Sequence, residues 1–225
     1  MRAAAARAAT EWVTAAVRTT LRSADNASRS GSKFFGDLAR DIAPRIPVRD
    51  LETLKAHHHG LEGEALADAL VETAATAAGA LGAAGGIAAA RTALRRNPVT
   101  LAAQVLAEPL AVAAIEIKLL AELHEVYDVQ VPGSGTVRAR HFAAAWASAR
   151  GINPLDPTAA PASLGSGLKG QLGGRIATRL GSRFVRTGPL LAGAAAGGLV
   201  NGKGTRDFAA ATRVELRRLR DAANR

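Results

Sequence analysis

The chain of 225 residues contains no cysteine and few aromatic side chains. Without cysteine it has no disulfide bond, no cysteine-ligated zinc and no thiol nucleophile. Phe, Tyr and Trp together make up 4% of the residues, whereas alanine occupies 53 positions and glycine 23. A core filled by such small side chains requires backbones to approach one another closely. The length suits one domain with an extension at one end.

Runs of alternating apolar and polar residues, which are typical of strands, are also absent, and apolar residues recur with helical spacing instead. The sequence therefore predicts an all-α fold, a compact multi-helix bundle with hairpins rich in glycine and alanine. We expect Pro109 to kink or divide the helix over 98–127, and Thr205 to be the N-cap of the last helix. The predicted helices span residues 3–22, 34–42, 51–57, 62–95, 98–127, 137–150, 168–186, 189–200 and 205–223.

The chain is predicted to divide near residue 45. Residues 1–45 are expected to form a basic helical extension and a flexible linker, since the polar run SADNASRSGS follows the first helix. Residues 46–225 are expected to form the helical domain. The first helix contains Arg7 and Glu11, which make it too polar for the apolar region of a secretion signal. We therefore expect a cytoplasmic protein without a signal peptide.

The helix predicted over 98–127 carries apolar residues on nearly all sides, and such a helix belongs in the middle of a bundle. One apolar seam includes Ile115 and Leu119, and the other includes Leu110 and Ile117. Glutamates interrupt these seams, so we expect them to be partly buried and to need charged partners. They are Glu108, Glu116 and Glu122.

The formal net charge of +10 is concentrated at the two ends of the chain. Residues 1–50 carry a net charge of +4, residues 51–150 a net charge of −2, and residues 151–225 a net charge of +8. Within 168–186, arginines recur at every fourth position beside an apolar stripe with the same spacing. The pattern is typical of an amphipathic helix on anionic lipid, and pairing with the buried glutamates is the alternative. The candidate lipid-contacting residues are Arg175, Arg179, Arg183 and Arg186.

Two segments without charge, 73–90 and 187–202, are rich in small residues. In the first, only Leu81 and Ile87 are strongly apolar, and together they contribute about −1 kcal/mol to membrane insertion. Neither segment is convincing as a membrane-spanning helix. Each contains two glycines four residues apart, which predict a close helix contact in a soluble core or in lipid. These pairs are Gly82 with Gly86 and Gly193 with Gly197.

No catalytic, cofactor-binding or metal-binding group of residues is predicted. Residues 197–205 resemble part of a phosphate-binding loop, but such a loop follows a buried strand and no strand is predicted here. His57, His58 and His59 are adjacent, so they do not share one helical face. An enzyme that uses a buried Glu/His/Arg cluster remains one alternative. Its residues would be Glu108, Glu116, Glu122, His124 and Arg206.

Nucleic acid is a further possible partner, because the chain is strongly basic. No aromatic RNA-binding motif and no helix-turn-helix signature accompanies the charge, which makes this partner less favoured than a membrane.

Two segments resemble the EcsC-like family. They are IEIKLLAELHEVYDV over residues 115–129 and GPLLAGAAAGGLVNGKGTRDFA over residues 188–209. The sequence departs from the family pattern at Asp128, where glycine usually follows the tyrosine, and at Gly202, where an aromatic residue often follows the asparagine. The positions that match the family signature are Glu116, Glu122, Tyr127, Pro189, Gly193, Ala194, Gly197, Asn201, Thr205 and Arg206.

The resemblance covers roughly residues 60–223 and implies a helical protein that associates with membranes, in a family without an established catalytic activity. Together with the basic amphipathic pattern, it predicts a peripheral protein at the inner face of the cell membrane. Its expected partner is anionic lipid or a membrane protein, and no cofactor is expected.

Overall fold

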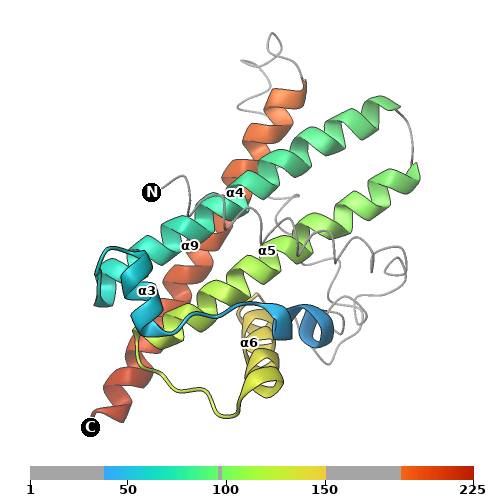
Figure 1. The fold of residues 1–225 in the computed structure, drawn as a ribbon. Coiled ribbons are helices and arrows are strands. Elements are labelled where there is room, and N and C mark those ends of the chain that lie inside the picture. Colours follow the sequence, from blue (N-terminus) through green and yellow to red (C-terminus); the bar gives the residue numbers. More distant parts are fainter. Residues whose placement is uncertain (1–37, 96–97, 151–188) are drawn as a thin grey trace.

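The computed structural model describes residues 38–95, 98–150 and 189–225 (Figure 1). These residues form helices and contain no strand, which confirms the predicted all-α fold. The predicted helices over 3–22 and 168–186 and the linker between 23 and 32 lie outside the described residues. The described elements are η1 (Leu38–Ile42), η2 (Ala43–Arg45), α3 (Leu51–His57), α4 (Gly63–Arg95), α5 (Pro98–Val126), α6 (Gly135–Ala149) and α9 (Pro189–Ala223).

Local sequence signals explain where α3, α4 and α5 begin. The carboxylate of Asp50 accepts a hydrogen bond of 2.8 Å from the backbone N–H of Thr53 and so caps α3. The chain then reverses through Gly60, whose φ of +79° is readily adopted by glycine. Pro98 begins α5, a position where its missing N–H is not needed.

Three long helices form the frame of the molecule (Figure 1). Helices α4 and α5 make an antiparallel hairpin, and α9 crosses α4 with the opposite chain direction. The short helix α3 lies at the end where α4 begins, whereas α6 and the η1–η2 turns pack against α5. None of the described helices combines the length and the apolar character needed to cross a membrane.

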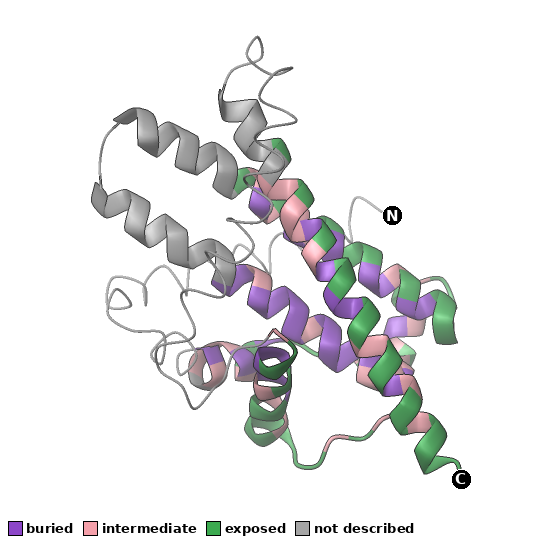
Figure 2. Ribbon diagram, turned by 180° about the vertical axis from the view of Figure 1, so that it is seen from behind, coloured by how far each residue is buried: buried purple, intermediate pink, exposed green. Residues whose placement is uncertain are grey.

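Helix α5 lies in the middle of the bundle, as its apolar seams predict, and most of its described side chains are buried while none is exposed (Figure 2). Its Leu110 and Ile117 belong to a cluster with Phe142 and Trp146 of α6. On another face, its Leu119 joins a second cluster with α3, α4 and α9. The second cluster includes Leu54, Leu66, Leu70, Leu123 and Leu216. The two seams therefore face two separate apolar clusters.

Two predictions about helix ends are wrong. The segments predicted as separate helices, 189–200 and 205–223, form the single helix α9. Thr205 is consequently not an N-cap, and its hydroxyl bonds to a side chain of α5 instead. Gly202 and Gly204 lie inside α9, where packing of this helix against its neighbours offsets their low helix propensity.

Pro109 does not divide α5, which is one helix from Pro98 to Val126. A proline inside a helix removes one backbone hydrogen bond and disfavours the helical conformation of the residue before it. The turns after Pro109 are buried in the two apolar clusters, and this burial outweighs the local cost.

Candidate functional site

Helices α4 and α9 approach each other most closely at glycines. A Cβ atom on Gly82 would overlap the carbonyl oxygen of Gly197, and a Cβ on Gly197 would overlap that of Gly82. One turn away, a Cβ on Gly79 would lie 3.1 Å from the carbonyl oxygen of Gly198. The close contact predicted for the glycine-rich segments is confirmed at Gly82 and Gly197, and it joins one segment to the other across the two helices. The surroundings of Gly86 and Gly193 are not described.

The same pair of helices is joined by ion pairs further toward the start of α4. Arg206 forms a two-pronged ion pair with Glu72, with both nitrogen–oxygen distances at 2.8 Å. Arg213 lies 2.6 Å from the carboxylate of Asp68. Three arginines of α9, Arg206, Arg213 and Arg217, thus pair with acids of α4.

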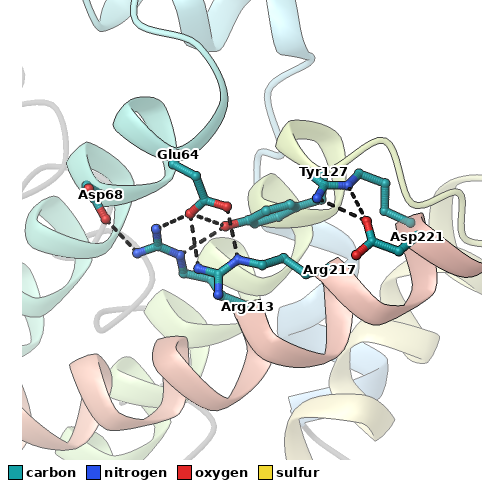
Figure 3. Close-up of polar contacts among 7 residues, drawn as sticks. Glu64, Asp68, Tyr127, Arg213, Arg217 and Asp221 are labelled. Atoms are coloured by element: carbon teal, nitrogen blue, oxygen red, sulfur yellow. Dashed lines mark hydrogen bonds and ion pairs between the residues drawn. The ribbon is translucent and has the colours of Figure 1, made fainter.

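Tyr127 connects this row of ion pairs to α5 (Figure 3). Its hydroxyl donates a hydrogen bond of 2.9 Å to Glu64 and accepts one of 3.0 Å from Nε of Arg213. Glu64 is also bound by Arg217, at 3.0 and 3.1 Å. The guanidinium of Arg220 lies 5.8 Å from the centre of the tyrosine ring. Although Tyr127 is only 2% exposed, its hydroxyl therefore has partners both as a donor and as an acceptor of hydrogen bonds.

The hydrogen bonds from Arg217, and then those from Arg213 and Tyr127, lower the pKa of Glu64 to about 2. Because the ionised carboxylate is favoured in the folded state, it stabilises the fold above the ordinary carboxyl pKa of about 4.3, and this contribution disappears as the pH falls toward 2. We expect the wild type to lose free energy of unfolding in this range more steeply than the Glu64→Gln variant. Urea unfolding followed by circular dichroism at several pH values measures both slopes. Parallel pH profiles for the two proteins would contradict this role.

Glu116 is the most enclosed charged residue among the described residues, with 0% exposure. Its carboxylate accepts hydrogen bonds from Nε1 of Trp146 at 2.8 Å and from the hydroxyl of Thr205 at 2.9 Å. Arg150 donates to it from Nε at 3.0 Å and also from Nη2. Arg150 further donates to the carbonyl of Gly204. One carboxylate on α5 thus ties α6 and α9 to the middle of the bundle.

Glu122, one and a half turns further along α5, is 3% exposed and has its own partners. Arg49 binds it from Nε at 2.8 Å and from Nη2 at 3.1 Å, and Lys118 pairs with it from the preceding turn. Lys118 also donates to the carbonyl of Pro47. Burial lowers the pKa of Lys118, although its ion pair with Glu122 acts in the opposite direction. This cluster holds the segment before α3 against α5.

The structure distributes the predicted signature residues over separate contacts. Glu116 and Thr205 bond to each other, Glu122 pairs with Arg49 and Lys118, and Tyr127 joins Glu64. Arg206 pairs with Glu72, Gly197 lies in the contact with Gly82, and Asn201 lies beside that contact. Pro189 begins α9, while the side-chain surroundings of positions 189–194 are not described. The lipid-contact candidates Arg175, Arg179, Arg183 and Arg186 lie outside the described residues.

The residues proposed for an enzyme do not converge within the described part of the chain. Glu116, Glu122 and Arg206 each have a different ionic partner. The ring of His124 lies near the carbonyl of Leu120 and meets Phe142 edge-on. The side chain of Glu108 is not described, and no group of three or more His, Asp or Glu side chains in the described ranges is placed to hold a metal ion. The carboxylates of Glu64, Glu72 and Glu116 each bind groups on another helix.

Sequence reasoning missed the partners of the buried glutamates. The arginines of 168–186 were the predicted partners, whereas in the structure Glu116 forms an ion pair with Arg150 and Glu122 forms one with Arg49. One signal was available, because Arg150 follows Trp146 by four residues and so shares its helical face. Arg49 lies in a segment without helical periodicity, and no local pattern points to it.

Comparison with protein-family models, curated proteins and solved structures finds no match to the chain. The similarity of residues 115–129 and 188–209 to EcsC-like proteins therefore stays a prediction. Glu116, Gly197, Thr205 and Arg206 share one feature in the described geometry, since each takes part in a contact that fixes α9 against α4 or α5. Glu122 instead holds the segment before α3.

Proposed function

We propose that the protein associates peripherally with anionic membranes at the inner face of the cell membrane, through the basic segment that contains Arg175, Arg179, Arg183 and Arg186. The observation that supports this proposal is that buried glutamates of α5 already form ion pairs with residues outside that segment. Three internal acids were expected to neutralise that segment. Glu116 and Glu122 already have other cationic partners, whereas the side chain of Glu108 is not described.

The acids of α4 also form ion pairs. Glu64, Asp68 and Glu72 pair with arginines of α9. Residues 151–225 carry a net charge of +8, to which the four arginines of residues 175–186 contribute. Arginines that alternate with an apolar stripe favour an anionic lipid surface, where each contributes about 1 kcal/mol of attraction.

Vesicle flotation tests this function with a charge-matched pair of variants. Replacing the four candidate arginines by glutamine is expected to weaken binding of the full chain to phosphatidylglycerol-containing vesicles by about a hundredfold or more, because about 4 kcal/mol of attraction is removed. The control replaces four exposed arginines elsewhere and changes the net charge equally. The control positions are Arg45, Arg140, Arg218 and Arg225.

The control is expected to retain most of the binding, and vesicles of phosphatidylcholine alone are expected to bind the wild type weakly. Equal losses in the two variants would show that only net charge matters and would contradict the proposed segment. Absence of binding to either vesicle, together with salt-dependent binding to duplex DNA, would replace the membrane by nucleic acid as the partner.

A further inference from the structure

We propose that His57 and His58 form a proton-sensitive switch for the segment 47–50, which leads from the η1–η2 turns into α3 (Figure 1). While both imidazole rings are neutral, the segment is held against α5. When both rings are protonated, the segment is released. The switch does not depend on the proposed membrane association, because all of its groups lie in the described part of the bundle.

The segment 47–50 is attached to α5 by charged groups. Arg49 binds the carboxylate of Glu122 with two hydrogen bonds, of 2.8 and 3.1 Å. Lys118 pairs with the same carboxylate and also donates to the backbone carbonyl of Pro47. Val48, which lies between these two contacts, is 43% exposed. The attachment of the segment to α5 is therefore mainly electrostatic.

His57, the last residue of α3, touches this attachment directly. Its Nδ1 atom lies 3.4 Å from Nη1 of Arg49. Because a guanidinium group has donors but no acceptor, the ring nitrogen must be the acceptor in this contact and carries no proton. A protonated imidazole would place a positive charge and an N–H donor against the guanidinium. The contact therefore requires a neutral His57.

His58, the C-cap of α3, is half-buried and is subject to the same charges. Burial lowers the pKa of its imidazole, the charge of Arg49 lowers this pKa further, and Glu122 acts in the opposite direction. His57 and His59 also lower the pKa of His58. Because the neutral ring is favoured in the folded state, it stabilises this arrangement above the ordinary histidine pKa of about 6.5, and the contribution is lost as the pH falls below that value.

The other acids around α3 already have partners. Asp50 caps the helix, and Glu52 and Glu62 both pair with Lys55. In the described structure, the carboxylate that faces the cations of the segment is that of Glu122. Protonation of the two histidines adds two positive charges to a cluster in which two cations already share this carboxylate. Repulsion between these like charges favours release of the segment.

A spin label on the segment measures its release. Since the chain has no cysteine, Val48→Cys in the full chain takes one nitroxide at an exposed position. Between about pH 7.5 and pH 5.5 we expect the rotational correlation time of the label to fall by about twofold or more, because the backbone of the segment is no longer fixed. The matched control is a label on Val137→Cys of α6, an exposed valine at 52% exposure, and it is expected to keep its correlation time.

Histidine variants that carry the label at position 48 identify the titrating groups. With His57→Gln and His58→Gln together, the label is expected to be as restricted at pH 5.5 as at pH 7.5. With His141→Gln, which changes an exposed histidine of α6, the response of the wild type is expected to remain. Arg49→Gln removes the attached group itself and is expected to free the label at both pH values. This variant tests the attachment even if the double histidine variant does not fold.

Four results would overturn the switch. The first is a label at position 48 whose correlation time does not change with pH. The second is a response that persists when both histidines are glutamine, since another group would then titrate. The third is a label that stays restricted at pH 7.5 in Arg49→Gln. The fourth is an equal change at position 137 with loss of helical circular dichroism, which would show general acid unfolding.

Discussion

Replacing Glu116 by leucine is expected to lower the free energy of unfolding by about 3–5 kcal/mol. The substitution leaves the guanidinium of Arg150 without its carboxylate, and it removes the acceptor of the Trp146 and Thr205 hydrogen bonds. Since these groups lie on α6 and α9, the loss loosens two helices from α5. Urea unfolding followed by circular dichroism measures the change.

Two further variants make this result specific. Glu215→Leu makes the same chemical change at an exposed position on α9, where a single ion pair of 3.8 Å to Arg218 is lost, and it is expected to cost less than about 0.5 kcal/mol. Glu116→Leu combined with Arg150→Met is expected to regain part of the stability, because an apolar pair can replace a buried ion pair, while Trp146 and Thr205 still lack their acceptor. Equal stability of the Glu116→Leu and Glu215→Leu proteins would contradict the structural role of Glu116.

Substitution of Gly82 by alanine is expected to lower the free energy of unfolding by about 2–3 kcal/mol. The added Cβ overlaps the carbonyl oxygen of Gly197, and a backbone atom cannot turn aside as a side chain can. Helices α4 and α9 must therefore separate. Thermal and urea unfolding of the variant measure the loss, which opposes a gain of about 1 kcal/mol in helix propensity.

Gly204→Ala is the matched control for this substitution. Gly204 lies inside α9, and a Cβ there would meet only the guanidinium of Arg150 at 3.9 Å and beyond, an ordinary contact. We expect Gly204→Ala to be as stable as the wild type or more stable. If Gly82→Ala were stabilised to the same extent, the two helices would not be in contact at Gly82 and Gly197.

The position of α5 in the middle of the bundle could be predicted because the apolar pattern that indicates it lies within the helix itself and repeats over several turns. Two apolar seams repeat over many residues, and the structure places Leu110 and Leu119 in different clusters, as those seams require. The close approach at the glycines was predictable for a similar reason, since residues without side chains permit few other kinds of packing. Which glycine meets which depends on the relative alignment of two helices, and the glycines in contact, Gly82 and Gly197, are more than a hundred positions apart in the sequence.

The continuity of α9 and the partners of the glutamates depend on contacts distant in sequence. The run Gly202-Lys203-Gly204 has low helix propensity, and only the packing of its glycines against α4 and near Arg150 explains why the helix continues. Thr205 is a favourable N-cap by residue type, yet a buried carboxylate 89 positions earlier provides its partner. Propensity describes a segment alone and cannot include such a partner.

Fractionation of cells that express the full chain tests peripheral membrane association most directly. The protein is expected to sediment with membranes at low salt and to be released by a wash at about 1 M salt, where electrostatic attraction is screened within ~3 Å. The Arg175/Arg179/Arg183/Arg186→Gln variant should already be in the supernatant before the wash. Recovery of the wild type in the supernatant at low salt, or its retention on membranes after the wash, would contradict the account.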